Sequence, residues 1–243
     1  YNNLTDSVRG LTKNLYTNAT LAEGTNNGTD ITSLNSNGFS LGTDSNGDGF
    51  NRNGQTYVGW QWRASNAAGV TNTAGSITST VSANTSSGFS IVTYTGTGAN
   101  ATVGHGLGVA PKMIIVKERS AARDWAVWQT TLTGGQALFL DSTLAVQSDT
   151  TIWNNTTPTS SVFSVATSTY TNQSTGTYVA YCFAEVAGFS KFGSYTGNGS
   201  TDGPFIYTGF RPKFVMVKCS STTGDWAMYD GTRNPYNYAD AYL

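Results

Sequence analysis

The residues with the clearest potential for chemistry lie at positions 43–51, in the stretch TDSNGDGFN. Asp44, Asn46 and Asp48, followed by a glycine, have the order D-x-N-x-D-G that opens a calcium-binding loop. The twelfth position of such a loop usually supplies a bidentate glutamate, but here it is Gln55. Gly, Asn and Asp are also typical of a hairpin tip, where they tolerate left-handed backbone. We interpret the stretch as a hairpin tip, with a calcium site as the alternative.

Catalysis would need a nucleophile, a base or paired carboxylates in a recognisable arrangement. His105 is the only histidine, and no Ser or Cys nucleophile motif accompanies it. Asp124 and Asp225 each precede a tryptophan, and paired carboxylates are the machinery of glycosidases. A carboxylate that recurs in every module is more simply structural. We therefore predict no catalytic residue, no metal, no cofactor and no enzyme activity.

Aromatic side chains could stack against sugar rings. Trp125 and Trp226 occupy equivalent positions of an internal repeat, as do Trp60 and Tyr181, which indicates packing rather than ligand contact. Three aromatics without such partners are predicted to lie in loops and are the better binding candidates: Trp153, Tyr170 and Phe50.

Two cysteines are too few for a disulfide-stapled scaffold. Cys182 and Cys219 align with the polar residues Gln61 and Glu118 of neighbouring repeats. The alignment predicts free thiols on partly exposed faces of two different modules.

Composition predicts an all-β protein and argues against two classes of partner. Only 11% of residues are charged, while 12% are aromatic and 28 are Gly, a profile that suits strands and tight turns. A formal net charge of -1 leaves no basic surface for nucleic acid. No apolar stretch approaches the roughly 20 residues of a membrane span. We expect neither nucleic acid nor membrane as a partner.

An internal repeat organises the chain. The sequence GFSIVTYTGTGANATVGHGLGVAPKMIIVK at 88–117 returns as GFSKFGSYTGNGSTDGPFIYTGFRPKFVMVK at 188–218. A second set of matches lies out of phase with the first: LYTNATLA at 15–22 with LFLDSTLA at 138–145, and YVGWQW at 57–62 with YVAYCF at 178–183.

Together the two sets define one module that is complete only at residues 88–187. Residues 1–64 are then the C-terminal half of a preceding module, and residues 188–243 are the N-terminal half of a third. Residues 65–87 are rich in Ser, Thr, Ala and Asn and are predicted to be a linker with one short strand.

Alternating patterns and β-branched runs predict six strands in the complete module, with one helical turn at 142–145. They are expected at 90–94, 112–118, 125–129, 137–141, 162–165 and 177–184. Short antiparallel strands at this density favour tandem β-sandwich modules of jelly-roll type.

Three strings carry a resemblance to a known family: GHGLGVAPKMIIVK, YVAYCFAEVAGFSKFGSYTGNGSTDGPFIYTGFRPKFVMVK and GDWAMYDGTRNPYN. They resemble an uncharacterised β-rich repeat domain found in tail-fibre and other virion structural proteins of tailed bacteriophages, many of them marine. The resemblance implies a virion component, a fibre or surface adhesin, that forms homo-oligomers and contacts other virion proteins. It supplies no catalytic or ligand residues.

The two half-modules suggest a mode of assembly. Residues 1–64 of one subunit and 188–243 of the next could complete a sandwich head to tail, building a filament. The alternative is a segment of a longer fibre. Asp6 and Asp230 mark the same point of the repeat, so the two halves overlap there.

Our first interpretation is a structural virion protein of a tailed phage, located on the virion or extracellularly, with loops free to contact a host surface glycan. A secreted bacterial glycan-binding adhesin is the second, and a polysaccharide-degrading enzyme is the third.

Overall fold

The structure is a computed structural model that describes residues 2–26, 30–43 and 49–233. Within these ranges every strand pair in the named sheets is antiparallel, and the two helices are single turns. The all-β prediction is confirmed.

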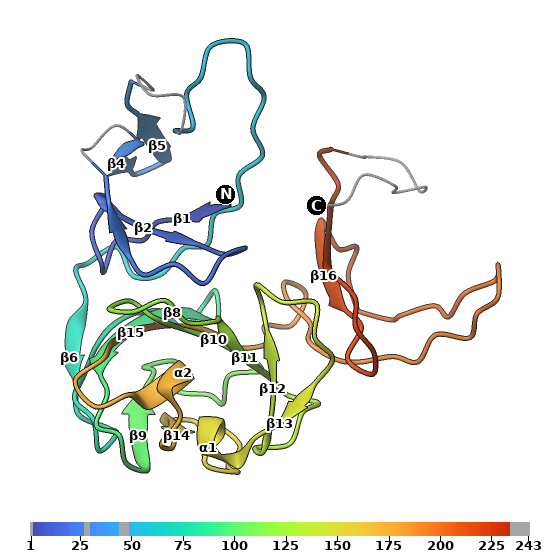
Figure 1. Cartoon of the computed structure of the whole chain (residues 1–243). Coiled ribbons are helices and arrows are strands. Elements are labelled where there is room, and N and C mark those ends of the chain that lie inside the picture. The colour runs from blue at the N-terminus through green and yellow to red at the C-terminus, as the bar shows by residue number, and fades with distance from the viewer. Residues whose placement is uncertain (1, 27–29, 44–48, 234–243) are drawn as a thin grey trace.

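One eight-stranded sheet forms the centre of the molecule, in the order β13-β12-β11-β10-β15-β8-β7-β6 (Figure 1). Its strands are β6 (Val70–Asn72), β7 (Ser79–Asn84), β8 (Phe89–Thr95), β10 (Met113–Glu118), β11 (Ala126–Gln129), β12 (Gln136–Phe139), β13 (Gln147–Ser148) and β15 (Thr177–Phe183). The six strands predicted from sequence in the complete module are all present, because their apolar runs are buried in the core of the molecule.

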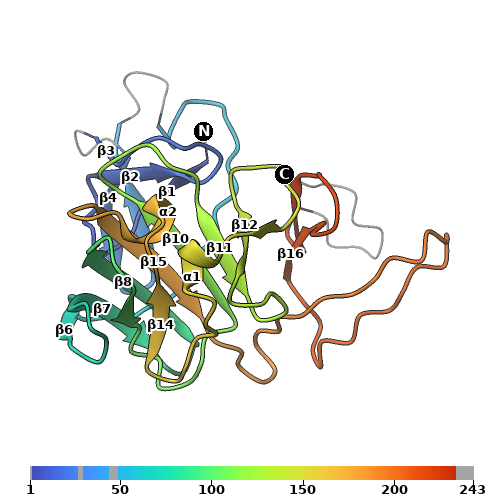
Figure 2. The same ribbon diagram turned by 60° about the horizontal axis from the view of Figure 1, so that its bottom comes forward.

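A second, smaller layer covers one face of the sheet. It consists of β9 (Ala101–Gly104) paired with β14 (Val162–Val165), and of the short helices α1 (Thr150–Trp153) and α2 (Thr169–Asn172). This layer lies below the sheet in Figure 1, and α1, α2 and β14 lie in front of the sheet in Figure 2. The core between the layers contains residues of both, among them Val92, Ile114, Trp128, Phe163 and Tyr178. This pair of layers is the sandwich of the central module.

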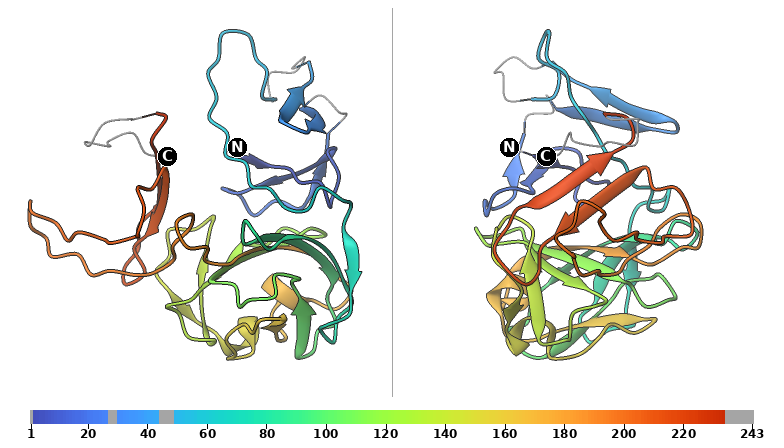
Figure 3. Two further views of the ribbon diagram at one scale, coloured as in Figure 1. Left: turned by 180° about the vertical axis from the view of Figure 1, so that it is seen from behind. Right: turned by 90° about the vertical axis from the view of Figure 1, so that its right-hand side faces the viewer.

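The N-terminal half-module lies over the opposite face of the sheet, and the C-terminal half-module packs at the end of the sheet where β12 and β13 lie (Figures 1 and 3). The N-terminal one holds β1 (Asn3–Leu4), β2 (Lys13–Tyr16), β3 (Gly24–Thr25), β4 (Ile31–Asn35) and β5 (Gly38–Leu41), and the C-terminal one holds β16 (Phe214–Lys218) and β17 (Trp226–Asp230). A second apolar cluster joins Leu15 and Trp226, one from each half, to Trp125 and Leu138 of the sheet. Burial on both faces explains why the central strands are continuously apolar instead of alternating.

Strand registers reproduce the sequence repeat. In the N-terminal half, Asn3 pairs with Tyr16 and Leu4 with Leu15, just as Ala126 pairs with Phe139 and Val127 with Leu138 in the central module. The pairing of β16 with β17 likewise follows that of β10 with β11 position for position. Each half therefore has the same strand pairing as the corresponding part of the central module.

Three sequence predictions differ from the structure. Residues 65–87, predicted to be a linker with one strand, contribute both β6 and β7 to the sheet, because β7 pairs with β8 over five positions and buries Val81. The segment before His105 contains β9, which is not among the six predicted strands. The single helical turns are α1 and α2, whereas residues 142–145 are not helical.

Candidate functional site

The predicted calcium ligands cannot be placed. Asp44, Asn46 and Asp48 lie outside the described residues, so the calcium alternative stays a prediction. Among residues 2–26, 30–43 and 49–233, no group of three or more His, Cys, Asp or Glu side chains is arranged to hold a metal ion. The same part of the chain has no helix of the length and apolarity that crossing a membrane requires.

His105 is buried, and its ring is engaged on both sides by backbone. The N–H of Leu107 donates to Nδ1 at 3.2 Å, so the proton of the neutral ring lies on Nε2, which donates to the carbonyl of Thr159 at 3.1 Å. Burial lowers the pKa of His105, outweighing the hydrogen bond to Thr159, which acts in the opposite direction. The side chain ties two loops together and has no nitrogen left for a substrate.

Two of the predicted binding aromatics belong to the core. Trp153 lies on α1 and is 2% exposed, while Tyr170 lies on α2 with its ring centroid 4.9 Å from that of Phe139. The prediction of loop positions for these two residues is wrong, because each helical turn folds its aromatic against the sheet. Phe50 is partly buried in the N-terminal half-module, and its binding role stays a prediction.

The two cysteines have opposite surroundings, and neither is in a disulfide. Cys182 is fully buried, not partly exposed as its alignment with Gln61 predicted, because β15 is a central strand covered on both faces. Burial raises its pKa to about 12. Cys219 is exposed, and hydrogen bonding with Thr222 and then Ser221 lowers its pKa to about 7.

The most elaborate polar site joins the N-terminal half-module to the central module, and we name it the first joint. At its centre is Lys117, whose side chain is fully buried at the end of β10. Its Nζ donates to the carbonyls of Glu118 at 2.9 Å, Thr20 at 3.1 Å and Ala121 at 3.4 Å. Burial lowers the pKa of Lys117 to about 8. The ammonium of Lys117 thus donates its hydrogen bonds to carbonyls of both modules.

The same arrangement recurs between the central module and the C-terminal half-module, at the second joint. Lys218 Nζ donates to the carbonyls of Gly224 at 2.6 Å, Thr143 at 3.0 Å and Cys219 at 3.2 Å. Thr143 is the repeat counterpart of Thr20, as Lys218 is of Lys117. Each joint is therefore held by a lysine of one module reaching a threonine carbonyl of its neighbour.

Tryptophan and backbone hydrogen bonds repeat in the same way. Trp125 Nε1 donates to the carbonyl of Tyr16 at 2.9 Å, and Trp226 Nε1 donates to that of Phe139, the counterpart of Tyr16, at 2.8 Å. Two backbone bonds also occur in both joints: Arg123 N to Thr20 O and Glu23 N to Arg119 O in the first, Gly224 N to Thr143 O and Val146 N to Ser220 O in the second. The recurring Asp124 and Asp225 come directly before these tryptophans.

In the described part of the chain, the first joint holds a buried ion network that the second joint lacks. Arg9 pairs with Asp6 and with Glu23, and Glu23 also accepts two hydrogen bonds from Arg119. The hydroxyl of Tyr181 donates to Asp6 at 2.6 Å. Burial alone would raise the pKa of Glu23, but hydrogen bonds from Arg119 and then Arg9 hold it below its ordinary value.

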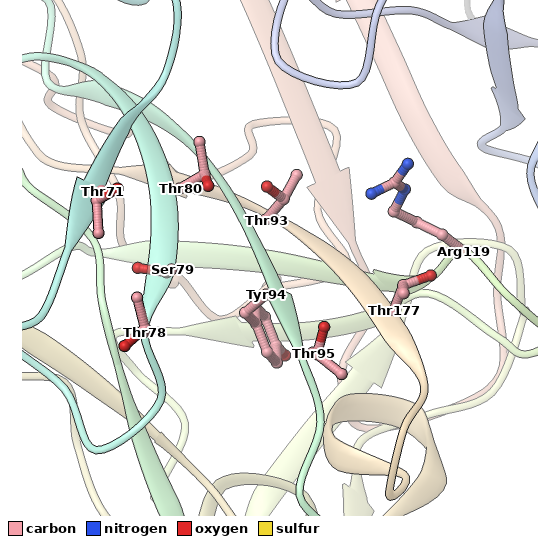
Figure 4. A pocket seen from close by; sticks show the side chains of 9 residues that line it. All are labelled: Thr71, Thr78, Ser79, Thr80, Thr93, Tyr94, Thr95, Arg119 and Thr177. Carbon is pink, nitrogen blue, oxygen red and sulfur yellow. The ribbon is translucent and has the colours of Figure 1, made fainter.

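The open hollows near this joint are small and polar. One, of about 220 Å³, lies over β7, β8 and β15 and is lined mainly by hydroxyl side chains (Figure 4). That is below the roughly 300–1,000 Å³ of typical ligand pockets. Arg119 reaches its rim but is already bonded to Glu23. Neither the hollow nor the joint combines a nucleophile with a free base.

Sequence reasoning missed the joint residues, although the signal was present. Lys117 and Lys218 end the matched strings PKMIIVK and PKFVMVK, and Asp6 and Arg9 recur as Asp230 and Arg233. A lysine that recurs after four apolar residues is a candidate for a buried, fully bonded ammonium.

The entire sequence, residues 1–243, matches a family described as Domain of unknown function (DUF7483). The chain belongs to the DUF7483 family. The DUF7483 match takes in the complete module, both half-modules and both joints. No curated protein and no solved structure matches this DUF7483 chain.

Proposed function

We propose that this DUF7483 protein is a structural component of a tailed-phage virion, in a fibre or surface appendage, with a role in host adsorption and no enzymatic activity. The resemblance of its repeat strings to virion proteins supports the proposed location. The joints support the structural role.

The observation that carries the proposal is how the buried polar groups are used. In an enzyme, perturbed groups gather in a cleft and face a substrate. Here Lys117 bonds the carbonyl of Thr20, and Arg119 pairs with Glu23, across the first joint. The buried polar groups of the chain thus fix one module against the next. Such fixed contacts suit a stiff scaffold that displays its loops.

The test is to locate the protein in its natural particle. Purified particles would be analysed by mass spectrometry and labelled with an antibody raised against the full chain. We expect peptides from the central module in the particle and label on its surface. Particles free of the protein, with all of it in the soluble fraction of the lysate, would overturn the proposal.

Glycan binding is a second candidate, favoured by the hydroxyl-lined hollow of Figure 4. Thr80 and Thr93 face each other there across β7 and β8, and polar hydroxyls can bond a sugar. A glycan array with the wild type and a Thr80→Val, Thr93→Val variant tests it. Binding lost in that variant, but kept in a Thr131→Val control, would favour the second candidate.

A further inference from the structure

The half-modules expose residues whose counterparts form the core of the central module. Tyr57 is 51% exposed and Val58 39%, whereas their counterparts Tyr178 and Val179 are each 0% exposed. The same holds for Phe39, 42% exposed against 1% for Phe163, and for Val215, 39% exposed against 0% for Ile114. Each half therefore presents an apolar surface that its own residues do not cover.

One missing strand pairing accounts for much of this exposure. In the central module β10 pairs with β11 on one edge and with β15 on the other. Its counterpart β16 pairs with β17 only, within the described part of the chain. The counterpart of β15 is residues 57–62, YVGWQW, which form no strand. An unpaired strand edge and an unpaired strand of the right sequence are thus both present.

These two segments already lie together in the structure. The rings of Trp62 and Phe214 are 5.9 Å apart, and those of Trp60 and Phe214 are 5.6 Å apart, both in edge-to-face arrangement. The guanidinium of Arg233 lies 5.7 Å from the centre of the Trp60 ring. Trp62 and Phe214 are the counterparts of Phe183 and Met113, which are direct partners across β10 and β15.

The joints show how a closed arrangement would be built. Trp125 of the central module bonds Tyr16 of the N-terminal half, while Trp226 of the C-terminal half bonds Phe139, the central counterpart of Tyr16. Such reciprocal contacts are those of an isologous, two-fold interface. Both halves also join one apolar cluster on one face of the sheet. Together the two halves therefore contact the central module as a single second module would.

We propose that the two half-modules of one chain close into a second β-sandwich, with residues 57–62 added as an antiparallel strand to the free edge of β16. The register follows from β10 and β15: Trp62 lies opposite Phe214, Trp60 opposite Met216, and Tyr57 opposite Cys219. The finished unit is a pair of sandwiches related by a pseudo-two-fold axis. This inference does not depend on the proposed virion role.

The same chain, not a second copy, supplies the strand. The contacts of Phe214 with Trp60 and Trp62 occur within one chain, and both halves are already fixed to the same sheet by the two joints. Tethering of this kind gives effective concentrations of about millimolar. A second copy at micromolar concentration competes poorly with it. This replaces the head-to-tail filament as our expectation for how the halves are completed.

A single substitution tests the register, because Cys219 is already in place. In Tyr57→Cys the two thiols lie on directly opposite residues, whose Cα atoms are about 4.5–5.5 Å apart in antiparallel pairs, within the reach of a disulfide. Diamide oxidises the pair, accepting the two protons and two electrons that the thiols lose. Val58→Cys is the matched control, since adjacent strand residues point to opposite faces and its partner is Lys218.

We expect Tyr57→Cys to form an intrachain disulfide at least about tenfold faster than Val58→Cys, at a rate independent of protein concentration. A non-reducing gel would show a monomer of altered mobility, and peptide mapping would show the 57–219 link. Covalent dimers whose yield grows with concentration would overturn the proposal in favour of a second copy. Equal rates for both variants, or no link in either, would overturn it outright.

Hydrogen exchange on the wild-type chain tests the same closure without a substitution, so a misfolded variant cannot affect the result. Closure predicts slow exchange for alternate amides of residues 57–62 and for those of β16, as in β15 and β10. Exchange in 57–62 as fast as in an unpaired loop, with β10 and β15 protected, would show that the halves stay open.

Discussion

Trp125 and Trp226 make the same hydrogen bond from two different modules, to the carbonyls of Tyr16 and Phe139. Because these carbonyls are themselves equivalent, the bond is a property of the joint and not of one local environment. Trp125 is fully buried, and Trp226 packs at the edge of the same apolar cluster. The stability of the molecule should therefore depend on the joints in a way that paired substitutions can measure.

Substituting Trp125→Phe keeps an aromatic ring but removes the donor to Tyr16. We expect the free energy of unfolding to fall by about 1–3 kcal/mol more than in Trp128→Phe, because the variant loses the hydrogen bonds that Nε1 donates to the carbonyls of Tyr16 and Ala19. Trp128 is buried too, but its Nε1 has no hydrogen-bond partner in the structure, so that control loses ring volume alone. Urea denaturation of both variants measures the difference; equal losses would contradict a role for the hydrogen bond.

Lys117→Met should change how stability depends on pH. Burial lowers the pKa of Lys117 from 10.5 to about 8, so between these values the unfolded chain binds more protons than the folded chain. The free energy of unfolding of the wild type, relative to Lys117→Met, should therefore rise with pH across this window. Denaturation from pH 7 to 10.5 measures it, with Lys213→Met as an exposed control. A difference that stays flat with pH would contradict the prediction.

Arg9→Met and Arg233→Met compare one ion pair in two settings. Arg9 has no exposed side-chain surface, and its loss leaves the buried Asp6 without a cation while Glu23 keeps Arg119, so we expect a cost of about 3–5 kcal/mol. Arg233 is 21% exposed and makes the same bond to Asp230, so about 1 kcal/mol is expected. Guanidinium denaturation tests the order. If Arg233→Met is the costlier change, the C-terminal half depends on this pair more than its exposure indicates.

The only histidine gives a direct test of the buried core. Since burial lowers the pKa of His105, the folded chain takes up its proton at a lower pH than the unfolded chain. Stability should then decline as pH falls through the ordinary histidine range near 6.5. NMR titration of the single imidazole measures the pKa of His105, and no second histidine complicates the assignment. A pKa at or above the ordinary value would show that the ring is not held as the bonds to Leu107 and Thr159 imply.

The local hydrophobic pattern was enough to predict the strands of the central module, because runs such as MIIVK and YVAYCF favour a strand over any other secondary structure. It was not enough for β6 and β7, whose Ser- and Thr-rich sequence resembles a linker until pairing with β8 buries alternate residues. The burial of Cys182 was missed for a related reason, since its polar counterpart Gln61 belongs to a segment that is unpaired in the structure.

Short sequence motifs could not predict the candidate site, which is formed by the two joints. No side-chain motif marks Lys117, because its partners are backbone carbonyls and one of them, that of Thr20, lies 97 residues away. Recurrence at equivalent repeat positions was the usable signal, and it points to assembly of modules instead of catalysis.

The hydrogen bond from Tyr181 to Asp6 spans 175 residues of sequence. During synthesis, Asp6 and Leu15 leave the ribosome long before the sheet that covers them exists. Contacts of such long range make folding slow, and the early segment is prone to aggregation while its apolar side chains are uncovered. The contacts of Asp6 and Leu15 with the sheet therefore form only after Tyr181 has been made, so this segment has to avoid aggregation until the sheet is complete.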